Sequence, residues 1–252
     1  MTVLGLPRDD EPFDFRRQAA SYGRYRRDYS AALYDAIEAR TGPAGGGIAI
    51  DVGCGTGFVT ASLCQRGWRA IGVDLSAPML AAASPGLALA RGRGEALPIR
   101  TSSASLVTAG TSFHWMPPGP TVAEMARVLR PGGWAAIFYR LGKPQGPGGR
   151  VIQGALAGLG LAVPEGMPGA LASPVVFAGS ELQASEPLRL ETTLEFTAED
   201  FHGHVATIEW LRRLTGPLHA RFLDEVRDAL AREHPDGVAD PSEEHLILAR
   251  RR

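Results

Sequence analysis

Cysteine and lysine are scarce in this sequence of 252 residues. Cys54 and Cys64 are its only cysteines, and Lys143 is its only lysine. One cysteine lies inside a glycine-rich stretch and the other only ten residues later, which argues against a disulfide framework and a zinc site. A reducing cytoplasm fits this usage. Acids and histidines do not cluster at ligand spacing either, so no metal is expected.

A basic excess and long apolar runs are also lacking. The net charge is -1 and the pI is near 6.6, whereas a general binder of nucleic acid or anionic membrane would be basic. The chain contains no run of eighteen apolar residues, so no membrane span is predicted. Its first fifteen residues lack a basic-then-apolar signal, and we expect a cytoplasmic protein. The length suits one large domain, or one domain with a smaller cap.

Strand-like and helix-like segments alternate through the middle of the chain. Buried strands are predicted at 48–52, 68–75, 104–112 and 134–141, with helices after the first two strands and at 122–133. Ser76 and Pro78 suit the start of the second of these helices. Such alternation predicts an α/β fold with right-handed crossovers and a mostly parallel sheet. After residue 142 we expect an apolar stretch rich in glycine and proline, a strand at 188–196, two helices near 198–214 and 217–233, and a last strand at 243–251.

The segment IAIDVGCGTGF places Gly53, Gly55 and Gly57 directly after the first of these strands. Ligands of open parallel sheets bind beyond the carboxyl ends of strands, where glycines let backbone amides approach them. The dinucleotide fingerprint needs glycine at position 58, which is Phe58 here, so a dehydrogenase is not favoured. The next strand ends at Asp74, whose carboxylate can accept hydrogen bonds from both hydroxyls of a ribose. The alternative, purely structural roles are a tight turn for the three glycines and a helix-capping or solvated acid for Asp74.

Taken in order, DVGCGTG, VDLS, EALPI, TSFHWM and VLRPGGWAAI resemble the motifs of class I S-adenosylmethionine-dependent methyltransferases. The resemblance covers roughly residues 16 to 141 and is greatest to the small-molecule branch with ubiquinone/menaquinone-type and trans-aconitate-type enzymes. It implies a Rossmann-like fold, with a mostly parallel seven-stranded sheet, helices on both faces and a small helical cap. It also implies an N-terminal lid (1–47), a cofactor-binding core (48–141), an acceptor cap (142–187) and a C-terminal part (188–252) that completes the sheet.

The resemblance implies S-adenosylmethionine as the cofactor and indicates where it would bind. The glycine turn would meet its methionine part and ribose, Asp74 the ribose hydroxyls, and Leu75 with Met79 the adenine. The family's N-terminal tyrosine and arginine correspond to Tyr22 and Arg26, which would hold the cofactor carboxylate, a suitable task for a guanidinium. The full predicted set is Tyr22, Arg26, Asp51, Gly53, Gly55, Gly57, Asp74, Leu75, Met79, Glu95, Ala96 and Gly110.

This sequence departs from the family pattern at three places. The prolines that usually follow the N-terminal arginine are absent after Arg26. Ser105 stands where an acid is common before the fourth strand. The acid that bonds adenine has two candidate registers: Arg93 with Gly94, of which Arg93 cannot accept a hydrogen bond, or Glu95 with Ala96. We favour Glu95, and the register stays open.

Methyl transfer requires alignment of the nucleophile and exclusion of water, and a base only if the acceptor must lose a proton. His114 is the best candidate base and Tyr139 a second catalytic candidate, although His114 can equally be structural. His202 and His204 are weaker candidates, because a lone histidine on a helix is more often satisfied than catalytic. The residues expected to contact the acceptor are Tyr29, His114, Trp115, Arg140 and Trp210.

The acceptor itself stays open. The composition of residues 142 to 180 favours a hydrophobic small molecule such as a secondary metabolite, whereas Arg24, Arg27 and Arg140 could serve a small carboxylic acid. A non-methylating role on the same fold, as a cyclase, isomerase or regulatory binder, is the alternative function. A nucleic-acid methyltransferase is not favoured, because TSFHWMPP stands where the Asn/Asp-Pro-Pro-aromatic motif would be. A homodimer is compatible with the sequence.

Overall fold

The computed structural model describes residues 18–163 and 173–252. Its centre is an eight-stranded sheet in the order β3-β2-β1-β4-β5-β8-β6, with β7 also paired to β8. Strands β1 to β5 are parallel, and β8 runs antiparallel to β5. The strands are β1 (Ile48–Val52), β2 (Arg69–Asp74), β3 (Ala88–Arg91), β4 (Ala104–Gly110), β5 (Leu129–Gly142), β6 (Leu182–Ala184), β7 (Leu188–Phe196) and β8 (Val238–Arg251).

The predicted α/β class and mostly parallel sheet are confirmed, and the extra strand has a simple origin. β6 pairs with the end of β8, where Ala184 lies opposite Ala249, and β7 pairs with the preceding part, where Leu188 lies opposite Leu246. Both therefore lie along one edge of β8 and together occupy a single position in the sheet. The seven positions expected from the resemblance are all filled.

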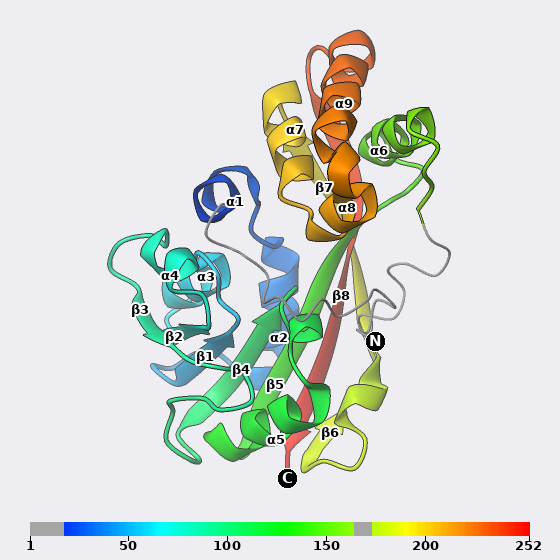
Figure 1. Ribbon diagram of the computed structural model, residues 1–252. Coiled ribbons are helices and arrows are strands. Elements are labelled where there is room, and N and C mark those ends of the chain that lie inside the picture. Colours follow the sequence, from blue (N-terminus) through cyan, green and yellow to red (C-terminus); the bar gives the residue numbers. More distant parts are fainter. Residues whose placement is uncertain (1–17, 164–172) are drawn as a thin grey trace.

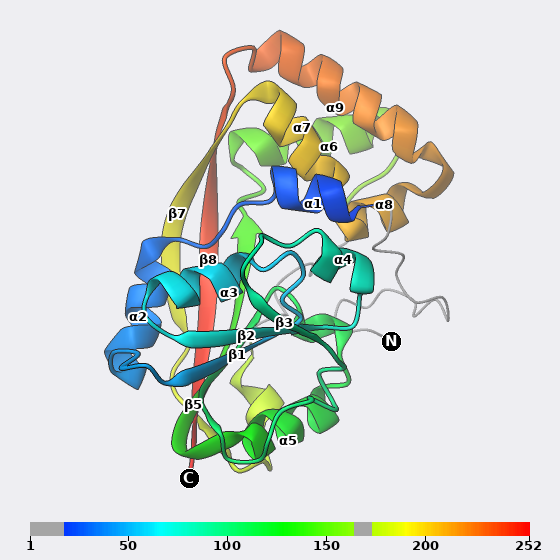
Figure 2. The same cartoon turned by 90° about the vertical axis from the view of Figure 1, so that its left-hand side faces the viewer.

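Two apolar clusters cover the two faces of the sheet, as expected where both faces of parallel strands are buried. Along β5, Ile137 and Tyr139 belong to the cluster beneath α5, while Ala136 and Phe138 belong to the cluster beneath α2 and α3. Figure 2 shows these helices on opposite sides of the strands. The helices are α1 (Ala19–Tyr25), α2 (Ala31–Thr41), α3 (Phe58–Gln65), α4 (Ala77–Ala81), α5 (Pro118–Val128), α6 (Pro147–Gly158), α7 (Ala198–Ala206), α8 (Glu209–Thr215) and α9 (His219–Glu233).

A helical layer stands beyond one end of the sheet. Helices α6, α7, α8 and α9 gather around the ends of β7 and β8 (Figure 1) and share a third apolar cluster that includes Phe201, Phe222 and Val226. The range 142–187, predicted to form the acceptor cap, contributes described elements at two places. Helix α6 joins this layer, while the 3-10 turn η3 (Pro174–Phe177) and β6 pack at the other end of the sheet, beside α5.

Several element boundaries differ from the sequence-based expectation. The helix expected to reach residue 133 ends at Val128, and the RPGG segment after it belongs to β5. Ala104 pairs with Leu129 while Leu106 pairs with Trp134, so this segment bulges out of the ladder. The short strands β3 and β6 were not expected, whereas the Ser76 cap of α4 is confirmed, because its side chain accepts from the amide of Met79 (3.4 Å).

Candidate functional site

A cavity of about 600 Å³ lies where the parallel strands end and the helical layer begins. The segments after β1, β2, β4 and β5 form its floor, and α1, α7 and α8 form its opposite wall. The predicted site residues that line it are Tyr22, Arg26, Tyr29, Asp51, Gly53, Gly55, Asp74, Leu75, Met79, Glu95, Gly110, His114, Trp115, Tyr139, Arg140 and Trp210. Gly57 and Ala96 lie outside its lining.

The glycine turn is left-handed at each of its three glycines, with φ of 70° at Gly53, 55° at Gly55 and 87° at Gly57. A Cβ on Gly53 would lie 2.5 Å from the Cβ of Ser112, so no side chain fits there. Gly57 is instead the N-cap of α3, and a Cβ on it would lie 2.6 Å from Leu87 Cδ1. The first two glycines therefore face the cavity, and the third starts a helix.

Asp74 is fixed by the backbone on both sides. Its Oδ2 accepts from the amide of Gly55 (2.9 Å) and its Oδ1 from the amide of Ser76 (2.7 Å). Burial raises the pKa of Asp74, while these hydrogen bonds lower it. Each oxygen keeps a second lone pair, so an oriented carboxylate faces the cavity with accepting capacity left. This arrangement suits two vicinal hydroxyls.

Asp51 lies one layer deeper, at the end of β1. It is almost fully buried and accepts hydrogen bonds from Thr60 (2.8 Å) and Thr108 (3.0 Å). Burial raises its pKa to about 6. Its two hydroxyl partners hold it in the floor of the cavity.

The two candidate registers for adenine recognition lie side by side. Arg93 Nη1 and Glu95 Oε1 are 3.4 Å apart, and both residues line the cavity, as does Gly94. Leu75 (47% exposed) and buried Met79 lie on the same side. Glu95 is the residue of this pair that can accept a hydrogen bond, and nothing in the described contacts selects a register.

The N-terminal segment bridges the core and the helical layer. Arg26 donates from Nε to Thr207 Oγ1 (2.8 Å) and from Nη2 to the Thr207 carbonyl (2.9 Å), and its guanidinium lies 5.1 Å from the ring centre of Tyr22. Tyr29 bonds through its hydroxyl to Thr111 Oγ1 (2.5 Å), and Thr111 has a positive φ of 47°. A strained non-glycine residue thus sits at the end of β4, in the cavity wall.

His114 and Tyr139 form an unsatisfied polar pair in this wall. His114 lies in the 3-10 turn η2 (Phe113–Trp115) that follows β4, and its ring centre is 5.8 Å from that of Tyr139. His114 Nδ1 and the Tyr139 hydroxyl are buried and have no hydrogen-bond partner among the described residues. Burial lowers the pKa of His114 to about 4 and raises that of Tyr139. At neutral pH the imidazole is therefore uncharged and the phenol protonated.

Arg140 lines the cavity, but its guanidinium is already bound. It donates from Nε to Oε1 of the fully buried Glu244 (3.0 Å) and stacks 4.8 Å from the ring centre of Tyr29. The ring centre of Trp115 lies 5.5 Å from the guanidinium of Arg213, and both residues line the cavity together with Trp210 of α8. His202, a weaker sequence candidate, contacts the carbonyl of Leu223 (3.1 Å) and does not line the cavity.

Most of the cavity wall contributed by α7, α8 and β8 was not predicted from the sequence. Phe201, Thr207, Glu209, Asp240 and Ser242 all line the cavity. These positions carry no motif, and their assignment needs the packing of α7 and α8 over the strand ends.

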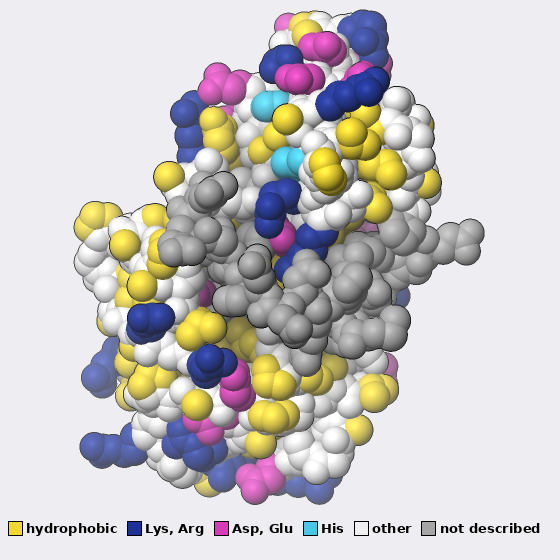
Figure 3. Space-filling view, viewed as in Figure 1, with side chains coloured by type: hydrophobic (Ala, Val, Ile, Leu, Met, Phe, Trp, Pro, Cys, Tyr) yellow, Lys and Arg dark blue, Asp and Glu magenta, His cyan; other side chains and the backbone are white. Residues whose placement is uncertain are grey.

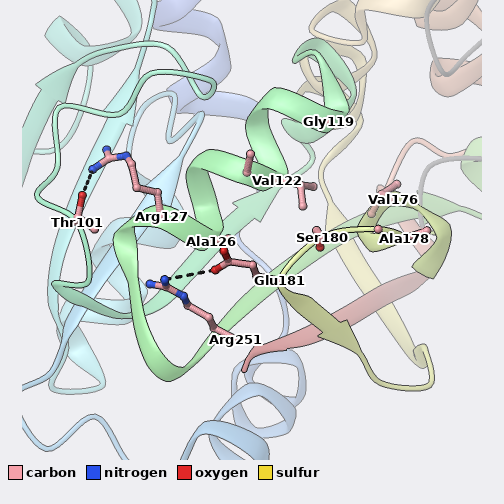
Figure 4. A pocket seen from close by; sticks show the side chains of 12 residues that line it. Thr101, Gly119, Val122, Ala126, Arg127, Val176, Ala178, Ser180, Glu181 and Arg251 are labelled. Carbon is pink, nitrogen blue, oxygen red and sulfur yellow. Dashed lines mark hydrogen bonds and ion pairs between the residues drawn. The ribbon is translucent and has the colours of Figure 1, made fainter.

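A second hollow, of about 480 Å³, lies between α5 and η3 (Figure 4). Small side chains line it, and its arginines are engaged: Arg127 donates to Thr101 (2.8 Å) and Arg251 pairs with Glu181 (3.3 Å). It contains none of the predicted site residues. On the face seen in Figure 3, charged side chains of both signs are interspersed over the described surface.

The cavity and the strand order define a class I methyltransferase fold, and comparison with known proteins agrees. Residues 50–137 match the family model described as a methyltransferase domain. An uncharacterized methyltransferase of Mycobacterium tuberculosis is 33% identical over 135 residues, which are 52% of this chain and 54% of that protein. The chain spans about half the length of the curated relatives it matches.

Solved structures share the fold. A putative type II methyltransferase from Anaeromyxobacter dehalogenans has a TM-score of 0.62 at 19% identity, covering 90% of this chain and 98% of that one. Geranyl diphosphate C-methyltransferase from Streptomyces coelicolor has a TM-score of 0.50 at 17% identity, covering 99% and 87%. These structures share the fold alone, while the match to a methyltransferase domain over residues 50–137 agrees with the expected class of enzyme and with S-adenosylmethionine as its cofactor.

The described residues offer neither a candidate membrane span nor a candidate metal site. Residues 18–163 and 173–252 contain no helix long and apolar enough to cross a membrane. Over the same ranges, no group of three or more histidine, cysteine or acidic side chains is placed to hold a metal ion.

Proposed function

We propose that this protein transfers the methyl group of S-adenosylmethionine to a small molecule bound in the cavity. One observation carries the proposal: a single cavity joins the glycine turn and Asp74 to the unsatisfied pair His114 and Tyr139. A cofactor held by the first set would present its reactive end toward the second. The cavity volume suits a cofactor together with a compact acceptor.

The residues present fit the cofactor. Asp74 would accept from the ribose hydroxyls, and Gly53 and Gly55 would let backbone amides approach without side chains. Leu75 and Met79 would flank the adenine, and Tyr22 with Arg26 would meet the carboxylate. The cofactor supplies a methyl group on a sulfonium, which is a good leaving group. What remains for the protein is to align the acceptor and exclude water.

His114 is the group best suited to take a proton from the acceptor. Its imidazole is neutral and Nδ1 has no hydrogen-bond partner in the described structure, while burial, which holds its pKa near 4, also makes it a weak base. The Tyr139 hydroxyl, protonated and also unpartnered, can donate a hydrogen bond that fixes an acceptor oxygen or nitrogen. We infer that His114 acts as proton acceptor and Tyr139 as a positioning donor.

The finer assignments stay predictions. They are membership of the ubiquinone/menaquinone-type or trans-aconitate-type branch, a role in secondary metabolism, a cytoplasmic location and a homodimer. The roles of Trp115, Arg140 and Trp210 toward the acceptor are also predictions. The division of the chain into lid, core, cap and C-terminal part is a prediction as well.

Calorimetric titration with S-adenosylhomocysteine tests the cofactor site. Asp74→Ala removes two ribose hydrogen bonds to a charged acceptor, and we expect affinity to fall at least about tenfold. Asp228→Ala, on the exposed face of α9, is the matched control and should bind like the wild type. Wild-type protein that binds no cofactor, or an Asp74 variant that binds equally well, would contradict the proposal.

A further inference from the structure

The charges around the acceptor side of the cavity are unevenly compensated. Each of three arginines that line it already holds an acid, with nitrogen–oxygen distances of 2.9 Å for Arg27–Asp200, 2.5 Å for Arg140–Glu244 and 2.9 Å for Arg213–Glu209. Arg24, the other sequence candidate for an acidic acceptor, pairs with Glu199 (2.7 Å). A carboxylate acceptor bound by any of these four arginines would have to break its ion pair.

Asp240, unlike these arginines, is a charged residue of the cavity wall without an ion-pair partner among the described residues. It lies on β8, is 9% exposed and lines the cavity. Its Oδ1 accepts one hydrogen bond, from the amide of Gly148 (3.1 Å). In residues 18–163 and 173–252, no arginine, lysine or histidine forms an ion pair with it. Within the described part of the chain, this buried carboxylate therefore has no cation as its partner.

An aromatic ring lies next to this carboxylate. A Cβ placed on Gly148 would be 2.4 Å from Phe201 Cζ and 2.6 Å from Asp240 Oδ1, so ring and carboxylate flank the same glycine. Both line the cavity, where Asp240 is 9% exposed and the Phe201 ring, packed against Phe196 and His204, is 1% exposed. A carboxylate beside an aromatic ring is the pairing that binds an ammonium group, through a charge-assisted hydrogen bond and cation–π attraction.

A structural role accounts for only part of Asp240. Gly148 lies in the first turn of α6, whose N-cap Gly146 offers no side chain, so Oδ1 caps this helix. Oδ2 has no partner among the described residues. Burial also raises the pKa of Asp240 to about 6, the shift of a carboxylate short of compensating charge.

We propose that the methyl acceptor carries a basic nitrogen, held as an ammonium group by Asp240 against the ring of Phe201. The Tyr139 hydroxyl and His114 would then meet another polar group of the same molecule, toward the cofactor. This inference rests on the proposed methyltransferase function, and it favours an amine over the small carboxylic acid left open by the sequence.

Three matched probes test it: phenethylamine, phenethyl alcohol and hydrocinnamate, each titrated calorimetrically into protein saturated with S-adenosylhomocysteine. We expect the amine to bind roughly tenfold or more tightly than the alcohol, and the carboxylate least tightly. Asp240→Asn keeps an oxygen to cap α6 but loses the charge. It should abolish the preference for the amine and leave affinity for S-adenosylhomocysteine unchanged.

Asp236→Asn, in the exposed turn before β8, removes a charge outside the cavity and should behave like the wild type. Thermal unfolding of both variants shows whether the α6 cap is retained. The proposal is overturned if phenethylamine binds no better than the alcohol, if it does not bind, or if Asp240→Asn binds it like the wild type. Failure of S-adenosylhomocysteine to bind would instead count against the proposed function, and the probes would then be titrated without it.

Discussion

The protonation and hydrogen-bonding capacity of each side chain in this site depend more on its surroundings than on its residue type. Asp74 is half-buried and Asp240 is buried, and backbone amides hold both oxygens of the first but only one of the second. His114 owes its neutral state to burial alone, since no charged group contributes to its lowered pKa. The chemistry of each residue is therefore predicted from what surrounds it.

His114 gives a prediction at this scale that links pH to stability. Its pKa is about 4 in the folded protein and 6.5 in its ordinary state, so the unfolded chain binds the proton more readily. Its contribution to stability is full above pH 6.5 and is lost as the pH falls toward 4, by up to roughly 3 kcal/mol. In His114→Gln, urea unfolding should show a smaller loss of stability over this range than in the wild type.

His114→Gln also tests whether this histidine takes part in catalysis. If His114 accepts a proton, kcat in His114→Gln should fall about 10²- to 10⁴-fold while affinity for S-adenosylhomocysteine is kept. An unchanged kcat would show that the histidine is structural, or that the acceptor needs no base. In the unfolding experiment, an equal loss of stability between pH 6.5 and 4 in the wild type and in His114→Gln would contradict the claim that burial lowers the pKa of His114.

At the scale of elements, the contact between α1 and α7 holds the N-terminal segment over the cavity. A Cβ on Gly203 of α7 would lie 2.5 Å from the ring of Tyr25, so the two helices meet where α7 has no side chain. Arg26 reaches Thr207, just beyond α7, from the same segment. Packing of α1 against α7 therefore positions Tyr22 and Arg26.

Gly203→Ala tests this contact. We expect a loss of roughly 1–3 kcal/mol in the free energy of unfolding from overpacking, together with weaker cofactor binding. Gly154→Ala in α6 is the matched control, because a Cβ there meets nothing within 4 Å and should stabilise by about 0.5–1 kcal/mol. A Gly203 variant as stable as this control would show that α1 is not held by the contact.

The helices and strands also show which features of the fold could be predicted from the sequence and which could not. The strand, glycine turn and Asp74 were predictable because buried branched residues, glycines and an acid each carry a local signal. The RPGG segment was read as a helix end because proline and glycine usually terminate helices, but here they form a bulge inside β5. β3 and β6 have four and three residues, too few to show a period.

At the scale of the whole molecule, the site lies between a core with strong motifs and a helical layer with none. Gly53, Gly55, Asp74 and His114 come from the core and were named from the sequence. Phe201, Thr207 and Asp240 come from the layer above and needed the three-dimensional packing. The cavity lining contributed by the core was thus predicted from the sequence, while the lining contributed by the helical layer depends on contacts between residues distant in the chain.

Transfer of an isotopically labelled methyl group from S-adenosylmethionine tests the central claim most directly. Wild-type protein is incubated with labelled cofactor and a panel of small aromatic amines, alcohols and carboxylic acids, and the products are analysed by mass spectrometry. We expect a labelled small molecule, formed fastest from an amine-bearing acceptor and not formed by Asp74→Ala. Cofactor binding without any labelled product would contradict methyl transfer and favour a non-methylating role for the same fold.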